Sequence, residues 1–206
     1  MQKQDPLLPE HYYHIFNRGN SKENIFREPA NYTYFMELYL KYIHPIADLF
    51  AYCLMPNHFH FALQLKGLQS LKSSKVSETS EVPEISNAYS QYFSNYFNAY
   101  SKAFNKRFDR TGSLFQARFR RKIVASDEYL LNLIHYIHKN PQEHKFVKDF
   151  RKYFYSSYDA VLSTKETHVA RTQVLELFGD VREFVEFHER EYDFSMIRAL
   201  VEDDEI

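Results

Sequence analysis

The stretch from Leu54 to Leu65 constrains the fold most, because it combines the period of a β-strand with two imidazoles on one face. Successive side chains of a strand point to opposite faces. The phenylalanine and leucine residues within 59–65 therefore predict contact with a core, and His58 and His60 share the other face. Two histidines at this spacing can bind one divalent cation with both rings, although an isolated pair is also common as surface polar residues.

A second stretch predicts a short helix that starts near Tyr129 and ends at Pro141. Its leucines and isoleucines recur at the i, i+3, i+4, i+7 spacing of a helix that buries one face. Tyr136 and Asn140 lie one turn apart beside that face, so both can point into a cleft between helix and sheet. Ser126 and the two acidic residues that follow it provide an N-cap and a favourable first turn.

These stretches resemble the HUH-type single-tyrosine transposases, and within them the REP-associated tyrosine transposase branch. Residues 55–60 are similar to the family's histidine-hydrophobic-histidine strand, and residues 136–141 to its nucleophile helix. Residues 16–20, 112–116 and 155–158 add further similarity in the family's order, so the resemblance covers roughly residues 11–160. Two places differ: residues 142–145 replace a usual Val-x-Ala-Gly, and Tyr155 replaces a usual tryptophan.

The resemblance implies a metal-dependent enzyme that nicks and joins single-stranded DNA during transposition, next to a DNA hairpin. It implies that Tyr136 attacks the DNA to form a 5′-phosphotyrosine link, and that Asn140 completes the cation site of His58 and His60. Mg²⁺ or Mn²⁺ is the expected cation, whereas the ligand types alone also allow Zn²⁺. Tyr129, two turns earlier on the helix, is the reserve candidate for the nucleophile.

Two other functions remain open from the sequence. The chain could be a catalytically inactive nucleic-acid-binding or regulatory module on the same fold, or a metal-dependent phosphodiesterase that uses water while Tyr136 is structural. Binding alone requires neither the two histidines nor the tyrosine and asparagine, which favours the enzyme. The sequence leaves a monomer and a homodimer equally open.

The net charge of −1 conceals two opposite regions. Residues 101–122 contain eight Lys and Arg residues against Asp109 alone, a net charge of +7, while residues 176–206 are strongly acidic. A local basic patch suits the phosphate backbone of nucleic acid and predicts affinity that falls with salt. The candidate DNA-binding residues are Asn17, Arg18, Arg110, Arg118, Arg120, Arg121 and Lys122, and three of them, Arg118, Arg120 and Lys122, are expected on one strand face.

The order of predicted elements indicates an α+β ferredoxin-like sandwich, in which a central antiparallel sheet carries the His-x-His strand. Strands are expected at 12–18, 47–54, 57–65 and 114–124, and helices at 29–43, 87–108 and 129–140. Residues 1–160 would form the catalytic domain, with a flexible loop at 66–86. Residues 161–206 would add an acidic helical C-terminal extension.

Other features bear on compartment and on the remaining histidines. There is no apolar run near the ~20 residues of a membrane span and no apolar core of a signal peptide, so a cytoplasmic location is expected. The only cysteine, Cys53, excludes an internal disulfide and is expected to be buried in a strand. His135 and His138 are expected at the surface, and the sequence assigns no site to His14, His144 or His188.

Overall fold

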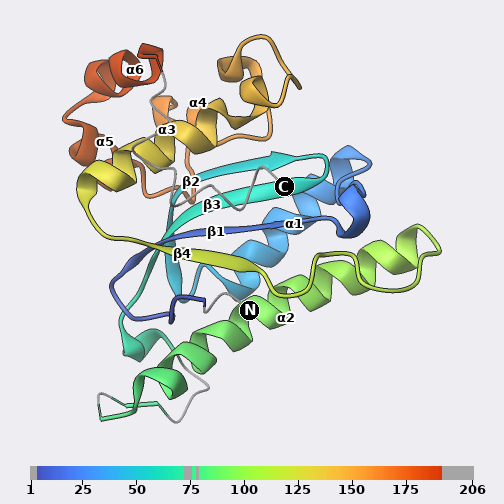
Figure 1. Ribbon diagram of the computed structural model, residues 1–206. Coiled ribbons are helices and arrows are strands. Elements are labelled where there is room, and N and C mark those ends of the chain that lie inside the picture. The colour runs from blue at the N-terminus through green and yellow to red at the C-terminus, as the bar shows by residue number, and fades with distance from the viewer. Residues whose placement is uncertain (1–3, 72–75, 78, 192–206) are drawn as a thin grey trace.

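A four-stranded antiparallel sheet is the frame of the protein (Figure 1). The computed structural model describes residues 4–71, 76–77 and 79–191. The strands are β1 (Tyr12–Arg18), β2 (Ala47–Met55), β3 (His58–Leu65) and β4 (Arg120–Val124), in the order β2-β3-β1-β4. This is the strand order of a ferredoxin-like sandwich. It places the histidine strand β3 inside the sheet, which confirms the predicted fold class.

Helices cover both faces of the sheet (Figure 1). On one face lie α1 (Pro29–Tyr42) and α2 (Val82–Arg107), and on the other α3 (Asp127–Glu143). Beyond α3 follow the shorter helices α4 (Tyr158–Leu162), α5 (Arg171–Phe178) and α6 (Val181–Glu189). Three short 3-10 turns complete the described elements, at Asn20–Lys22, Leu68–Ser70 and Phe150–Lys152. No helix in the described ranges is both long and apolar enough to cross a membrane.

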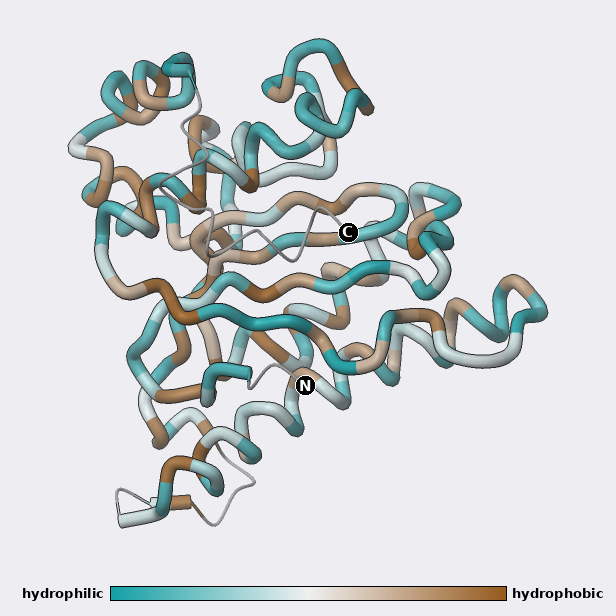
Figure 2. The backbone as a smooth tube through the Cα atoms, in the orientation of Figure 1, coloured by the Kyte–Doolittle hydropathy of each residue, from teal (hydrophilic) through white to brown (hydrophobic). Residues whose placement is uncertain are grey.

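The core between the sheet and α1 and α2 is built from aromatic rings. Phe59 and Phe61 of β3 contact Phe35 of α1, with ring centroids 5.1 and 6.1 Å apart, and Phe59 also contacts Phe97 of α2 at 5.5 Å. Much of α2 is pale in Figure 2, because tyrosines of intermediate hydropathy make up much of its buried side. The apolar face of β3 therefore packs as its alternation predicts.

The largest differences from the predicted boundaries are at the start of α2, the end of α3 and the start of β4. Helix α2 begins at Val82 and takes up the last five residues of the predicted loop, because Pro83 fits the first turn of a helix. The predicted flexibility of that loop falls partly on residues 72–75 and 78, outside the described residues. Helix α3 runs past Pro141 to Glu143: the proline lacks one N–H, but the His144 N–H still donates to the Asn140 carbonyl at 2.9 Å.

The fourth strand also differs from its prediction. It begins at Arg120 rather than at residue 114, because Arg118 has a φ of +65°, which a strand does not accommodate. Before it, Phe115 forms only an isolated bridge with Gly19. Arg118 consequently does not share a strand face with Arg120 and Lys122, and the predicted row of three cations is reduced to two.

Residues 153–157 cover the outer edge of β2. The backbone N–H of Leu54 donates to the Tyr155 carbonyl at 2.9 Å, and the Tyr52 N–H donates to Ser157 Oγ at 2.8 Å. Tyr155 stacks on Tyr32 with ring centroids 3.6 Å apart, so the tyrosine that replaces the usual tryptophan still makes an aromatic contact. Cys53 lies under this edge and is fully buried, as predicted.

The C-terminal helices attach to α3 through a chain of histidines. His188 Nδ1 donates to the Phe184 carbonyl at 2.7 Å, which leaves its Nε2 to accept from His138 Nδ1 at 2.9 Å. His138 Nε2 then accepts from Ser157 Oγ at 2.7 Å. Each bond in this order requires a neutral ring. The prediction that His135 and His138 lie at the surface is wrong, since both are buried where α6 packs on α3.

Burial sets the protonation of this cluster. It lowers the pKa of His188 to about 3 and of His135 to about 4, and it holds the pKa of His138 well below its ordinary value, with a smaller contribution from His188. The folded chain therefore keeps these rings neutral, while the unfolded chain protonates them near pH 6.5. The corresponding stability is complete above that pH and is lost as the pH falls toward the folded-state pKa values.

We expect the free energy of unfolding to decrease as the pH falls below about 6.5, by up to ~1.4 kcal/mol per pH unit for each histidine that stays neutral in the folded chain. His188→Gln should reduce that slope by about one such contribution, measured by urea unfolding at a series of pH values. His11→Gln, at an exposed histidine, is the matched control. An unchanged slope in His188→Gln would contradict the neutral chain.

Candidate active site

His58 and His60 project from β3 toward α3, away from the aromatic core. Their ring centroids are 5.2 Å apart, and both side chains are buried. The register of the sheet explains their surroundings: His58 pairs with Arg18 of β1 and His60 with Phe16, so these four side chains share one face of the sheet. The alternation of β3 thus concentrates two imidazoles beneath a helix.

Hydrogen bonds at Nδ1 orient both imidazoles. His58 Nδ1 donates to Asn57 Oδ1 at 2.6 Å, which leaves the lone pair of this neutral ring on Nε2. His60 Nδ1 lies 2.9 Å from His14 Nε2. When Nδ1 donates in that bond, His60 also presents the lone pair of Nε2. Partners of this kind fix the tautomer and the direction of histidine ligands in metal sites.

The electrostatic environment keeps both rings neutral. Burial lowers the pKa of His58 to about 3, with further lowering from His144 and Arg18. Burial likewise holds the pKa of His60 well below its ordinary value, with a smaller effect from His14. A neutral imidazole is the form that coordinates a cation, so neither histidine has to release a proton before it binds a cation.

Helix α3 brings Tyr136 and Asn140 over the histidines. The Ser126 side chain caps its first turn by accepting from the Tyr129 N–H at 3.3 Å. The buried Tyr136 ring stands edge-on to His60 at 5.6 Å and to His14 at 6.1 Å. Asn140 is fully buried one turn later and lies against His58, whose pKa it raises slightly against the effect of burial. The four side chains predicted as the site therefore lie together.

Two further residues belong to this cluster that the sequence did not single out. His14 contacts His60 and Tyr136, and His144 lies against His58 with ring centroids 4.9 Å apart. The parity of β1 held a signal for His14, because it shares a strand face with Arg18. His144 had no such signal, since its position depends on how α3 ends.

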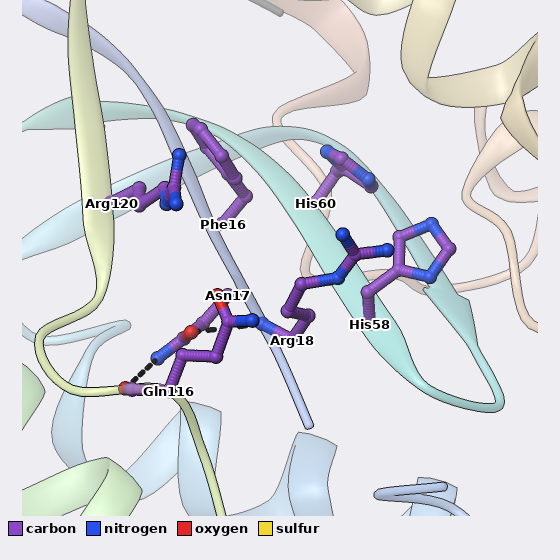
Figure 3. Close-up of a pocket in the computed structure, with 7 residues that line it drawn as sticks. All are labelled: Phe16, Asn17, Arg18, His58, His60, Gln116 and Arg120. Carbon is purple, nitrogen blue, oxygen red and sulfur yellow. Dashed lines mark hydrogen bonds between the residues drawn. The ribbon is translucent and has the colours of Figure 1, made fainter. Parts of the chain in front are cut away.

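The predicted DNA-binding residues separate into two groups. Arg18 and Arg120 line a cavity beside the histidines together with Phe16, Asn17 and Gln116, and in Figure 3 the Arg18 guanidinium lies next to His58. Lys122 shares the strand face of Arg120, because the two pair with His14 and Phe16 of β1.

The other cations lie elsewhere. Arg121 points to the opposite face, where it donates to the Asp5 carbonyl at 2.6 Å and to Ser90 Oγ at 3.0 Å. Arg110 donates to the Glu23 carboxylate and to Asn105 Oδ1. Both guanidiniums thus stabilise the fold through contacts within the chain.

No protein-family model and no curated protein matches the sequence. A solved structure does: the chain is similar to a REP-associated tyrosine transposase bound to a REP hairpin, with a TM-score of 0.56 and 14% identity over 80% of this chain and 86% of that one. The chain has a transposase-like fold. At this identity the likeness describes the path of the backbone, so the roles of individual side chains rest on the geometry of this chain.

Asn140 provides a test of whether a cation fits the candidate site. Within the described residues neither Oδ1 nor Nδ2 of this buried side chain has a hydrogen-bond partner, since its contact with His58 lies outside normal hydrogen-bond geometry. An unsatisfied buried amide costs about 1–3 kcal/mol, so a ligand for its oxygen is expected. Two imidazole nitrogens and one amide oxygen form a neutral donor set that suits Mn²⁺ and accepts Mg²⁺.

The alternatives within the site are weaker. Among the described residues no three His, Cys, Asp or Glu side chains form a metal cluster, so a cation bound by three side chains here would need Asn140 as the third ligand. Tyr129, the reserve nucleophile, lies on the first turn of α3 with its side chain exposed. Among the described residues, Tyr136 is the tyrosine whose ring lies against His60 and His14.

Proposed function

We propose that the protein is a metal-dependent enzyme that nicks single-stranded DNA and transfers the strand through a covalent link to Tyr136. The observation that supports it most is the cluster of Tyr136, His58, His60 and Asn140, which lies between β3 and α3 beside Arg18 and Arg120. A binding module of the same fold needs the cations but not the other four groups.

Each group has a separate role in this proposal. His58, His60 and Asn140 hold Mg²⁺ or Mn²⁺, which when bound supplies positive charge to the oxygens of the scissile phosphate. Asn57 and His14 orient the two rings. Arg18 stands next to His58 and can bind a phosphate oxygen with its planar guanidinium.

The reaction balances without a further reagent. The Tyr136 hydroxyl attacks phosphorus, the bond from phosphorus to the 3′-oxygen breaks, and a 5′-phosphotyrosine remains. The phenol proton leaves to solvent, and the departing 3′-oxygen takes up a proton to become a 3′-hydroxyl. Since phenolate is also a fair leaving group, a 3′-hydroxyl of another strand can reverse the step, which produces strand transfer instead of hydrolysis.

The substrate follows from the fold comparison as an expectation. The similar structure holds a REP hairpin, so we expect single-stranded DNA with a hairpin near the cleavage site. Residues 1–160 would form the catalytic unit and residues 161–206 an acidic helical extension that attaches through α6; its last part, 192–206, lies outside the described residues. A homodimer and a monomer are both compatible with a site whose four groups come from one chain.

The decisive experiment is the capture of a covalent intermediate. The protein is incubated with labelled hairpin oligonucleotides and Mn²⁺ or Mg²⁺ and is then separated by denaturing electrophoresis. We expect a labelled protein band that disappears with a chelator. Cleaved DNA without such a band would identify a water-using phosphodiesterase, and binding without cleavage would identify an inactive module.

A further inference from the structure

A polar groove of about 430 Å³ lies on the other side of the sheet from α3, between α2 and the segment 112–119 that leads into β4. One wall is a stripe of α2 residues spaced by helical turns. The other wall is the extended segment, and phenylalanine rings line part of the groove. Its polar and charged lining residues include Ser94, Asn98, Ser101, Lys102, Gln116 and Arg118.

The groove offers cations and amides to a ligand. Among the described residues, Lys102 and Arg118 are the charged side chains that line it, and no carboxylate does. Asn98, Lys102 and Arg118 are exposed, and their side chains make no hydrogen bond or ion pair with any residue that the structure describes. Arg110, by contrast, is held by Glu23. The charge of the groove therefore complements a polyanion.

The groove adjoins the cavity of the candidate active site. Asn17 and Gln116 line both this groove and the cavity that contains His58 and His60. Asn17 Nδ2 donates to the Gln116 carbonyl at 3.4 Å, which fixes the junction between the two (Figure 3). A strand whose phosphate reaches the histidines can thus extend past Gln116 toward α2.

The backbone of the segment adopts a sparsely populated conformation at one residue. Arg118 has a φ of +65°. For a residue with a Cβ this region costs roughly 1–2 kcal/mol. Such strain persists where the surrounding structure maintains it, and it is concentrated at binding and catalytic sites.

We propose that this groove binds the unpaired nucleotides that flank the scissile phosphate. Lys102 and Arg118 contact the DNA backbone, while the amides of Asn98 and Gln116, each with donors and an acceptor, bind base edges. An unpaired strand presents those edges, whereas a paired strand keeps its Watson–Crick edges engaged with its partner. This inference rests on the proposed function, since it assigns the substrate segment next to that site.

The test measures DNA binding with chelator present, so that no cleavage occurs. Fluorescence anisotropy compares a hairpin with single-stranded extensions and the same hairpin without them. We expect the extensions to strengthen binding, and the double variant Lys102→Ala/Arg118→Ala to remove that gain. The slope of log K against log salt concentration should become shallower by about 1.4, since each phosphate contact on a single strand contributes about 0.7 to it. Lys106→Ala, an exposed lysine of α2 outside the groove, is the matched control.

The amides are tested separately. Asn98→Ala should weaken binding of the extended hairpin and change its preference among extension sequences while leaving the salt dependence unchanged. Thermal unfolding of every variant verifies the fold. If the double variant and the unchanged protein gain equally from the extensions, the groove is not the binding site. A gain that depends on Lys102 and Arg118 in a protein that forms no covalent adduct would support the groove and reject the proposed chemistry.

Discussion

Tyr136→Phe removes the covalent protein–DNA adduct and strand transfer while the protein still binds cation and DNA. The change deletes one hydroxyl and preserves the ring that packs edge-on to His60 and His14. Loss of a nucleophile lowers rates by about 10⁴-fold or more, so no adduct should be detectable. The measurement is denaturing electrophoresis of labelled hairpin DNA after incubation with Mn²⁺, together with anisotropy for DNA binding.

Tyr129→Phe is the matched control, because it deletes the same atom from an exposed position on the same helix. We expect it to form the adduct at the rate of the unchanged protein. The opposite pattern, with an adduct in Tyr136→Phe and none in Tyr129→Phe, would move the nucleophile to the first turn of α3. Cleavage in Tyr136→Phe without any adduct would indicate that water is the nucleophile.

The double substitution His58→Gln/His60→Gln abolishes cation binding and cleavage. Changes in the partners of metal ligands cost about 10–100-fold in affinity, and loss of two ligands should exceed that. Glutamine keeps much of the buried volume, so it limits the cavity that alanine would leave at the fully buried His60. Calorimetric titration with Mn²⁺ measures the affinity, and thermal unfolding verifies the fold.

Asn140→Ala provides the graded comparison. A water molecule can replace one neutral oxygen ligand, so this variant should retain some cleavage at high concentrations of Mn²⁺. The control is His11→Gln at an exposed histidine, which should bind Mn²⁺ as the unchanged protein does. Full cation affinity in the double histidine variant would exclude β3 as the site.

Much of the fold was predictable from local sequence. The alternation within 58–65 predicted both the strand and the face of each side chain, since a strand has only two faces. The order of strands and helices predicted the sandwich, and Ser126 predicted the start of α3, where its side chain caps the helix. For the faces of β3 and the start of α3, the deciding interaction lies within a few residues along the chain.

The errors have separate causes. Arg118 adopts a positive φ although its neighbours have the composition of a strand, and β4 consequently starts at Arg120. His138 has no apolar character, yet it is buried because His188, 50 positions later, bonds to its ring. The helix-ending effect of Pro141 was overestimated, because residues 142 and 143 still complete a turn. At His138 a contact between distant residues outweighed local preference.

Strand parity aligns His58 with His60 and helical spacing aligns Tyr136 with Asn140, so the side chains of the candidate chemistry can be chosen from local pattern. The position of α3 over β3, the presence of His14 and His144 in the cluster, and the engagement of Arg121 and Arg110 within the fold follow from no local pattern. Periodicity is a property of one element, whereas the distance between two elements depends on the packing of the whole sheet and its helices.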